Sequence, residues 1–181
     1  MITALEKKPF ANSLKGPRLW LEKATTAHAE KLWECVLKDR ELRGVSWPGT
    51  ESVEEMRGYL QMVDLELPKD EVVYIMRLEQ EIIGSFHIHS LNYTYHRTEI
   101  GYGIQKAYEG YGFVSEAVEL VEKELKRLGF NRIEIRCNAD NIRSVSLAKR
   151  NAYRHEGTLL QECVEDGRFR DTAIFAKLLR S

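Results

Sequence analysis

Residues 99–117, EIGYGIQKAYEGYGFVSEA, join the end of a predicted strand to the start of the longest predicted helix. The loop between them carries Gly110 and Gly112. A helix start exposes unpaired backbone N–H groups and the positive end of the helix dipole, and glycines let an anion approach the backbone closely. The stretch therefore predicts a pyrophosphate site over Glu109–Val114. The alternative is a glycine-rich turn that binds no ligand.

Two familiar phosphate-binding loops do not match this stretch. A P-loop requires Gly-Lys-Ser/Thr, whereas Gly112 is followed by Phe113 and Val114. A dinucleotide fingerprint requires Gly or Ala where Ser115 stands, together with strand–helix repeats that the N-terminal half of this chain lacks. Neither a P-loop nucleotidase nor a doubly wound dinucleotide-binding fold is indicated.

Outward from this stretch, apolar periodicity predicts a mixed α/β fold. The predicted strands are Arg18–Lys23, Val72–Leu78, Ile82–Leu91, Tyr95–Ile104, Ile133–Cys137, Tyr153–Val164 and Arg168–Leu179. The long helix follows from an apolar stripe at helical spacing that Gly129 ends, namely Val114, Ala117, Val118, Val121, Leu125 and Leu128. The other predicted helices are Ala27–Asp39, a helix from an S-x-x-E capping box at Ser52 to about Leu67, and Asn141–Arg150, with a loop over Leu42–Thr50. Short connections between the three central strands favour an antiparallel meander.

Length and composition indicate one soluble domain. The chain has 181 residues, and its 27 Lys and Arg against 28 Asp and Glu give a net charge of −1, which argues against a nucleic-acid-binding protein. Three widely spaced cysteines indicate neither a disulfide framework nor a zinc knuckle and suit the reducing cytoplasm. No apolar run is long enough to span a membrane, and the N-terminus lacks the core of a secretory signal. We expect residues 1–16 to be a loosely packed lead-in and residues 17–181 to form the domain.

Three sequence blocks together resemble one known family. Glu99-Ile100-Gly101-Tyr102, Gly110-Tyr111-Gly112 and Ser115-Glu116-Ala117 resemble the acetyl-CoA motif of the GNAT acetyltransferases, in particular the RimJ/RimL branch that acetylates the N-termini of ribosomal proteins. A second block of that branch is resembled by the run that contains Asn141, Ser144, Leu147, Tyr153, Glu156 and Gly157. A third block is resembled by Asp171 with Leu178-Leu179. The resemblance covers about Arg18 to Leu179. It implies an α/β GNAT fold, with a mostly antiparallel sheet of about seven strands splayed in the middle and about four helices.

The resemblance also implies acetyl-CoA as cosubstrate and no metal. Pantetheine would pair with the backbone of Tyr102, Gly103 and Ile104 like an added strand. The pyrophosphate would lie over the loop residues Glu109, Gly110, Tyr111, Gly112, Phe113 and Val114, and the side-chain amide of Asn141 would bind the cofactor's arm. This chain departs from the family pattern at Ala107, where Gln or Arg is common, at Ala152, where Gly is usual, and at Gly103, where the branch commonly has an aromatic residue.

Direct transfer to an amine requires the amine to be neutral. An N-terminal amine has a pKa near ~8 and a lysine near ~10.4, so both need a base at neutral pH. Glu99, on the strand that should present the thioester, is our candidate, acting directly or through a water, and the alternative is a structural carboxylate paired with Arg97 or another cation. The resemblance implies Ser144 as the donor to the leaving thiolate, against the alternative of a helix-start serine bonded to backbone. Tyr153 is a second candidate donor.

Several other residues compete for a role in binding the acceptor. His87 and His89 lie two apart on a predicted strand and share a face, but no third metal ligand is evident. We expect them to be walls of the substrate pocket, or an alternative base. Trp47 lies in the loop expected to border the acceptor groove, where it would cover the substrate or anchor the loop. Cys137 is expected to be an inert strand cysteine.

The sequence thus predicts a cytoplasmic acetyl-CoA-dependent N-acetyltransferase, monomeric or homodimeric, that binds neither nucleic acid nor membrane. The leading acceptor is the N-terminal amine of a ribosomal or other protein. The first alternative is a small amine such as a polyamine or an antibiotic-like compound, for which Glu51, Glu54 and Glu55 would offer carboxylates. The second is an acyl-CoA-binding sensor without catalysis.

Overall fold

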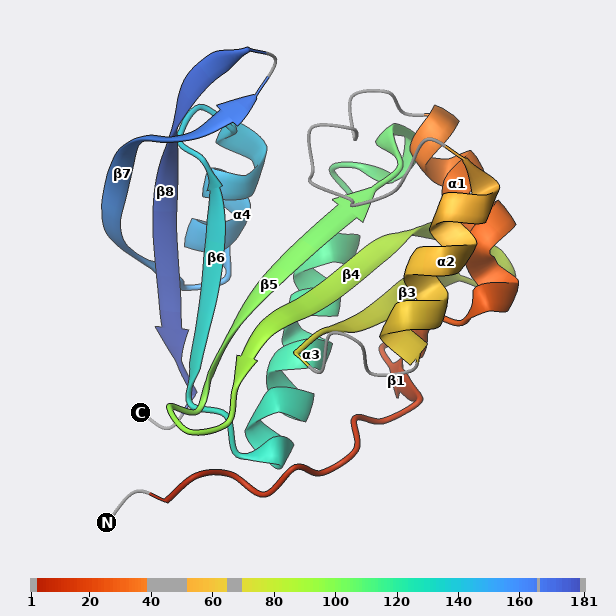
Figure 1. Cartoon of the computed structure of the whole chain (residues 1–181), viewed down its shortest axis with the longest axis horizontal. Helices are drawn as coiled ribbons and strands as arrows, with labels where there is room; N and C mark the ends of the chain where they lie inside the picture. The colour runs from red at the N-terminus through yellow and green to blue at the C-terminus, as the bar shows by residue number, and fades with distance from the viewer. Residues whose placement is uncertain (1–2, 39–51, 65–69, 166, 180–181) are drawn as a thin grey trace.

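The computed structural model of the chain describes residues 3–38, 52–64, 70–165 and 167–179 (Figure 1). Its helices and strands are β1 (Ser13–Lys15), β2 (Trp20–Lys23), η1 (Thr26–His28), α1 (Ala29–Lys38), α2 (Val53–Asp64), β3 (Val72–Leu78), β4 (Glu81–Asn92), β5 (Arg97–Ile104), η3 (Lys106–Tyr108), α3 (Phe113–Leu128), β6 (Arg132–Asn138), α4 (Ile142–Arg150), β7 (Arg154–Glu165) and β8 (Arg168–Leu178). Within the described ranges the strands form an eight-stranded sheet in the order β1-β2-β3-β4-β5-β6-β8-β7.

The sheet is splayed between β5 and β6. These two strands are parallel and pair only from Arg97 to Glu99 on β5 and from Arg132 to Glu134 on β6. Every other neighbouring pair in the sheet is antiparallel. Beyond Glu99 the two strands diverge, as Figure 1 shows, so the sheet divides into a half containing β1–β5 and a half containing β6–β8. The splay implied by the family resemblance is confirmed.

The helices cover the two faces of the sheet. On one face, Leu32 of α1 and Met56 and Leu60 of α2 pack against Val73 and Ile75 of β3. On the other face, the apolar stripe of α3 packs against inward-facing side chains of β3–β6, and α4 joins the same cluster through Ala148. Burying each large apolar side chain of this kind stabilises the fold by roughly 1.5–3 kcal/mol.

The helix α3 begins and ends at glycines, as its sequence predicts. Gly112 is the N-cap and Gly129 the C-cap, and both adopt positive φ angles, 82° and 93°. A residue with a Cβ is disfavoured in this left-handed conformation, so the two glycines set the helix bounds. The helix α2 likewise begins where the capping box predicts, because the Glu55 backbone N–H donates to Ser52 Oγ at 3.1 Å.

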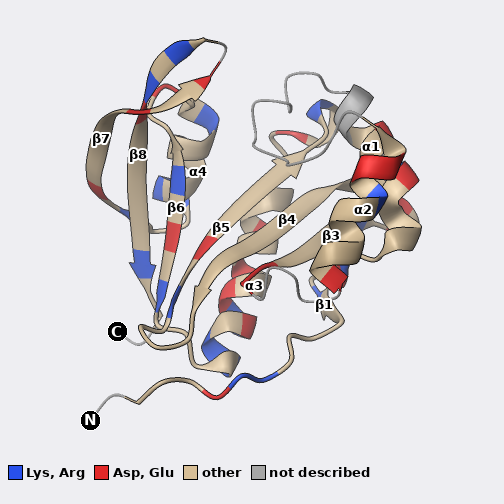
Figure 2. Cartoon of the chain, viewed as in Figure 1, with Lys and Arg blue, Asp and Glu red and all other residues tan. Residues whose placement is uncertain are grey.

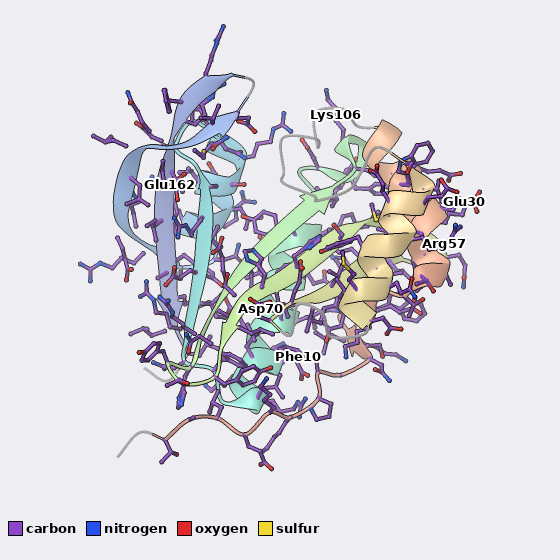
Figure 3. The ribbon with its side chains drawn as sticks, in the orientation of Figure 1. Phe10, Glu30, Arg57, Asp70, Lys106 and Glu162 are labelled. Carbon is purple, nitrogen blue, oxygen red and sulfur yellow. The ribbon has the colours of Figure 1, made fainter. Side chains whose placement is uncertain are left out.

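The segment before residue 17 is packed rather than loose. Phe10 is only 6% exposed within the main core, and the Tyr74 hydroxyl donates to the carbonyl of Ala11 at 2.7 Å. Figure 3 shows Phe10 beside the lower end of the sheet. The three-residue strand β1 adds an eighth strand to the seven expected. Isolated apolar residues such as Phe10 give no periodic signal, so the sequence does not reveal this packing; the domain boundary itself stays a prediction.

Two sequence-based predictions fall outside the part of the chain that the structure describes. These are the loop Leu42–Thr50 with Trp47, and the end of the second helix toward Leu67. No helix among the described residues is long and apolar enough to cross a membrane.

Candidate active site

A cavity of about 370 Å³ occupies the gap between β5 and β6. Its walls come from β5, β6, the start of α4 and the β7–β8 hairpin, and comprise Glu99, Ile100, Gly101, Tyr102, Ile135, Arg136, Cys137, Asn138, Asn141, Ser144, Glu162 and Thr172. The open splay leaves β5 and β6 unpaired along this gap, so each strand presents an edge to it. An extended ligand arm can pair with such an edge as an added strand.

The glycine loop leads from β5 to the start of α3. Gly110 has a φ of 82°, and a Cβ added there would meet no atom within 4 Å. No hydrogen bond among the described residues uses the backbone N–H groups of Gly110 through Ser115. Unpaired N–H groups at the N-terminus of a 16-residue helix form a favourable anion site, so the loop fits the diphosphate of coenzyme A.

Two arginines that the sequence reasoning missed brace this loop. Arg18 donates to the Tyr111 carbonyl at 2.9 Å and to Glu116 at 2.8 Å, while Arg143 of α4 donates to Glu109 at 2.7 Å. The partners lie 93, 98 and 34 residues apart in the chain, so no local pattern could have revealed them. Each guanidinium group is paired with a carboxylate, Glu116 or Glu109, so the two arginines fix the loop rather than add net positive charge to it.

The start of α4 brings Asn141 and Ser144 to the cavity. The Asn141 side chain caps the helix, because its Oδ1 accepts the Ser144 backbone N–H at 3.1 Å. This bond uses the backbone of Ser144 and leaves its hydroxyl for the cavity. Of Asn141, the amide nitrogen is the group that can serve a ligand.

Tyr102 and Cys137 face the cavity as neutral groups. Burial raises the pKa of Tyr102. The neighbouring Ser144 hydroxyl lowers this pKa but does not cancel the effect of burial. The Tyr102 hydroxyl itself makes no hydrogen bond of ordinary geometry. Burial likewise raises the pKa of the Cys137 thiol to about 11, so it is protonated at neutral pH. An inert thiol at this position agrees with the sequence-based prediction for Cys137.

Glu99 lies at the last paired position before β5 and β6 diverge. Burial raises its pKa to about 7; Arg136 acts in the opposite direction, and the charges of Glu134 and Glu162 add to the rise. Arg136 is itself paired with Glu162 at 2.8 Å, which weakens its effect on Glu99. Of the predicted alternative, a structural carboxylate paired with Arg97 or another cation, the pairing with Arg97 is not what the structure shows, because Arg97 lies 3.9 Å from Glu134 instead. A carboxyl group with a pKa near neutrality is suited to exchange protons at physiological pH.

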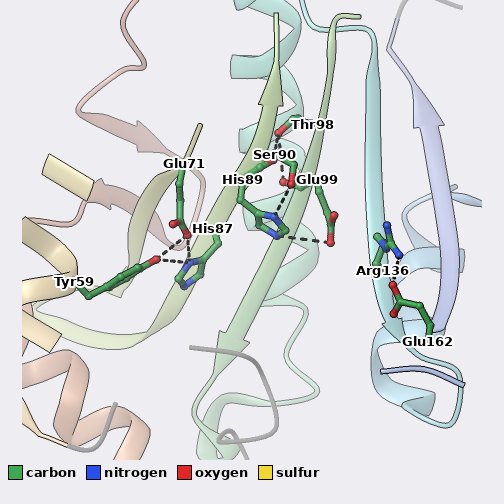
Figure 4. A network of polar contacts seen from close by, with 9 residues as sticks. All are labelled: Tyr59, Glu71, His87, His89, Ser90, Thr98, Glu99, Arg136 and Glu162. Carbon is green, nitrogen blue, oxygen red and sulfur yellow. Dashed lines mark hydrogen bonds and ion pairs between the residues drawn. The ribbon is translucent and has the colours of Figure 1, made fainter. Parts of the chain in front are cut away.

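The two histidines of β4 share a face of the strand, as predicted, and the structure places Glu99 on the same face. In the β4–β5 register, His89 is opposite Glu99 and His87 is opposite Gly101. His89 Nε2 is 3.8 Å from Glu99 Oε1, while His87 Nδ1 is 3.2 Å from Glu71 (Figure 4). Glu71 also accepts a hydrogen bond from the Tyr59 hydroxyl at 2.7 Å.

A second cavity of about 310 Å³ adjoins Glu99 on its other side. It is lined by Asp70, Ser90, Leu91, Asn92, Arg97, Thr98, Glu99, Glu134 and Arg136. Glu99 and Arg136 line both cavities, so the carboxylate stands where the two meet. Acidic and basic segments alternate along β6 (Figure 2), and the two cavities each have a further acidic wall residue, Asp70 in the second and Glu162 in the first (Figure 3).

Comparison with known proteins identifies the family. The model of the acetyltransferase (GNAT) domain matches residues 18–154. The chain belongs to the GNAT acetyltransferase family. It is 30% identical over 132 residues to the uncharacterized N-acetyltransferase p20 of Bacillus licheniformis, covering 71% of this chain and 74% of that protein. It is 25% identical over 159 residues to the ribosomal-protein-serine acetyltransferase of Escherichia coli K12, covering 85% and 89%.

Solved structures agree with this assignment. The acetyltransferase aligns with RimL, the ribosomal L7/L12 alpha-N-protein acetyltransferase in complex with coenzyme A, at a TM-score of 0.83 and 24% identity, covering 90% of this chain and 95% of that one. In that complex coenzyme A forms a disulfide with a cysteine of the protein. The likeness to RimL shows the fold, and the family match makes the present chain an acetyltransferase with acetyl-CoA as its cosubstrate.

Other predicted site residues of this GNAT protein lie away from the two cavities. Tyr153 is 3% exposed in the core, with Lys177 Nζ 5.6 Å from its ring centroid, and it lines neither cavity. Glu54 and Glu55 are exposed on α2 and also line neither. Trp47 and Glu51 lie outside the described residues. Among those that are described, no three His, Cys, Asp or Glu side chains gather as a metal site.

Proposed function

We propose that this acetyltransferase acetylates the N-terminal α-amine of a protein, with a ribosomal protein as the leading acceptor. The observation that carries the proposal is the position of Glu99, with a pKa of about 7, where the two cavities meet. The names of two similar proteins, the ribosomal-protein-serine acetyltransferase and RimL, support the same acceptor class.

The pKa of Glu99 favours an α-amine over a lysine side chain. An α-ammonium group has a pKa near ~8, about one unit above that of Glu99, whereas a lysine at ~10.4 is more than three units above it. Proton transfer to Glu99 is therefore slightly uphill from an α-ammonium and strongly uphill from a lysine. A general base works best when its pKa lies near the operating pH and the donor's pKa is close to its own.

The residues of the first cavity have the following proposed roles. The backbone of Tyr102, Gly103 and Ile104 would align the pantetheine arm, and the N–H groups of Gly110, Tyr111, Gly112, Phe113 and Val114 would hold the diphosphate beside Glu109, with Asn141 binding the arm by its amide. Acetyl-CoA, when bound, supplies a thioester carbonyl that a neutral amine attacks. Glu99 would take the amine's proton, and the Ser144 hydroxyl would donate to the departing sulfur.

The second cavity is the proposed entry for the acceptor. Since the first cavity would hold the cosubstrate, the remainder of the acceptor would extend from Glu99 toward the polar walls formed by Ser90, Asn92 and Arg97. Such walls suit the amide groups of a peptide backbone. Asp70 and Glu134 add two carboxylates to these walls, which suit a positively charged amine. His87 and His89 line neither cavity, so their role as walls of the substrate pocket stays a prediction, as does the role of Trp47 as a cover.

A panel of acceptors tests the proposal. Thiol release from acetyl-CoA is measured with peptides that have a free N-terminus, with the same peptides blocked at the N-terminus but containing lysine, and with polyamines. We expect kcat/KM to be at least ~100-fold higher for the free N-termini, as the two-unit gap in amine pKa suggests. A preference for the blocked lysine peptides or for polyamines would contradict the α-amine assignment. Tight CoA binding without turnover on any acceptor would support a sensor instead.

A further inference from the structure

We propose that His89 is a positioning residue that relays the proton from Glu99 to solvent by way of the second cavity. The inference rests on the proposed function and adds to it the route by which the base is regenerated. Figure 4 shows the two side chains facing one another from adjacent strands. The contact between Nε2 and Oε1 is 3.8 Å, a separation that can tighten when a substrate fills the site.

His89 stands out because the other charged neighbours of Glu99 are paired elsewhere. Arg136 is paired with Glu162 at 2.8 Å, and Glu134 with Arg132 at 2.8 Å. Over the described ranges of the chain, His89 is the one basic side chain within 4 Å of the Glu99 carboxylate. A proton that leaves Glu99 through a side chain therefore has His89 as its acceptor.

The charged groups around His89 leave its ring neutral and able to accept a proton. Burial lowers its pKa; Glu71 and Asp70, on the side of β3, oppose this, and His87 on its own strand reinforces it. Burial works against the ionisation of Glu71, but its hydrogen bonds with His87 and Tyr59 hold the pKa of that carboxyl below its usual value. Burial raises the pKa of Glu99 to about 7 and lowers the pKa of His89, so it disfavours the charged form of both side chains. They form a pair that shares one proton rather than a salt bridge.

The backbone conformation next to His89 orients its ring toward Glu99. The β4–β5 register shifts between His89 and Asn92, and Ser90 has a positive φ of 54°. A β-bulge of this kind re-aims a side chain, and such strain concentrates at functional sites. The bulge brings Ser90 Oγ within 3.4 Å of His89 Nδ1. An Nδ1–H that donates to Ser90 leaves the Nε2 lone pair facing Glu99.

Gly101 leaves room for the ring on the opposite strand. A Cβ at that position would lie 3.6 Å from His89 Nε2 and 3.9 Å from His87 Cβ. Because glycine has no side chain, nothing from residue 101 separates His89 from Glu99 or from an amine above them.

The proton balance of the relay is simple. The acceptor ammonium gives one proton to the Glu99 carboxylate, and the resulting carboxylic acid gives it to His89 Nε2. The imidazolium then releases a proton from Nδ1 past the exposed Ser90 to water in the second cavity. Glu99 is thereby ionised again, and His89 returns to its starting state once its tautomer resets.

The first test needs no turnover. Proton NMR of the His89 ring is followed against pH in the CoA-saturated protein, in wild type and in Glu99→Gln. We expect the wild-type signal to show two inflections, one of them near pH 7 from Glu99, and the variant to show one. Identical curves in the two proteins would overturn the inference even if the protein proved to acetylate no tested amine. This result is separate from the acceptor panel, which tests the proposed function.

The second test measures proton passage. His89→Ala is expected to lower kcat roughly 10-fold or more while changing the KM for acetyl-CoA less than twofold, and added imidazole should restore kcat in this variant but not in Glu99→Gln. His155→Gln, which removes an exposed histidine of β7, is the matched control and should keep wild-type kcat. A His89→Ala variant with wild-type kcat, or one that imidazole fails to rescue while it still binds CoA normally, would overturn the relay.

Discussion

Glu99 Oε1 lies 3.8 Å from His89 Nε2 across the β4–β5 pair, at the residue where β5 leaves β6. The same position that ends the pairing of the two strands thus buries a carboxyl group between two cavities. The splay creates the space for a cosubstrate, and Glu99 is buried because it lies where β5 and β6 separate. Fold and chemistry are linked at this residue.

Burial of Glu99 should cost stability at neutral and alkaline pH. Its folded pKa of about 7 lies above the ordinary 4.5, so its burial is harmless below pH 4.5 and destabilises increasingly as pH rises through 7. Glu99→Gln should therefore unfold at a higher urea concentration than wild type at pH 8. Its free energy of unfolding should be larger by on the order of 2 kcal/mol, and the difference should vanish near pH 4.5. A difference independent of pH would contradict the raised pKa.

Glu116 provides a control of opposite sign. Burial works against its ionisation, but hydrogen bonds from the Arg18 and Leu19 backbone and from the Arg18 side chain hold its pKa below the ordinary value. Its contribution is present above pH 4.5 and is lost as the pH falls through its folded pKa. Glu116→Gln should therefore be less stable than wild type at pH 7 and should approach it in acid, as urea unfolding at both pH values would show.

A substitution in the glycine loop should selectively weaken CoA binding. Gly110→Ala places a methyl group where the diphosphate would approach, and also strains a left-handed residue by roughly 1–2 kcal/mol. Gly167→Ala is the matched control, because Gly167 also has a positive φ, 69°, and open space around it, but lies beside the β7–β8 turn. Calorimetry should show at least ~10-fold weaker CoA binding for Gly110→Ala only, a loss of about 1.4 kcal/mol. Equal affinities in both variants would argue against the loop as the anion site.

Ser144→Ala should lower turnover more than CoA affinity. The helix cap survives the change, since Asn141 accepts the backbone N–H of residue 144 and not the hydroxyl. We expect kcat to fall ~10- to 100-fold while the CoA Kd stays within twofold, measured by thiol release and calorimetry. Unchanged turnover would remove Ser144 from the mechanism.

Cys137 should react slowly and should be shielded by the cosubstrate. Its thiol has a pKa of about 11 because it is buried, so little thiolate exists at pH 8. In a Cys35→Ser, Cys163→Ser background, iodoacetamide should modify it ~100-fold more slowly than a free thiol of pKa near 8.5, and CoA should slow it further. Modification that saturating CoA leaves unaffected would contradict the proposed path of pantetheine.

Much of the fold could be predicted because its signals are local. The bounds of β3, the stripe of α3 and the glycines at the two ends of that helix follow from periodicity and backbone conformation over a few residues. The same holds for the face shared by His87 and His89, which depends only on strand alternation, whereas the alignment of Glu99 with them depends on the β4–β5 register.

What could not be predicted depends on contacts between distant segments. Arg18 and Arg143 brace the glycine loop from other elements, and the second cavity depends on a bulge at Ser90 that no sequence pattern marked. Tyr153 was expected at the site because of its place in a family motif, but its side chain turns into the core toward Lys177. Such orientations are decided by packing between elements and have no local signature.

The dependence of kcat on pH, at saturating acetyl-CoA and saturating peptide with a free N-terminus, tests the central claim most directly. If Glu99 is the base, kcat should rise in proportion to its ionised fraction, with a midpoint near pH 7 and a plateau above it. Glu99→Gln should lose this rise and ~100-fold or more of the plateau rate. A variant that keeps the wild-type plateau and the same midpoint would show that another group removes the proton from the amine.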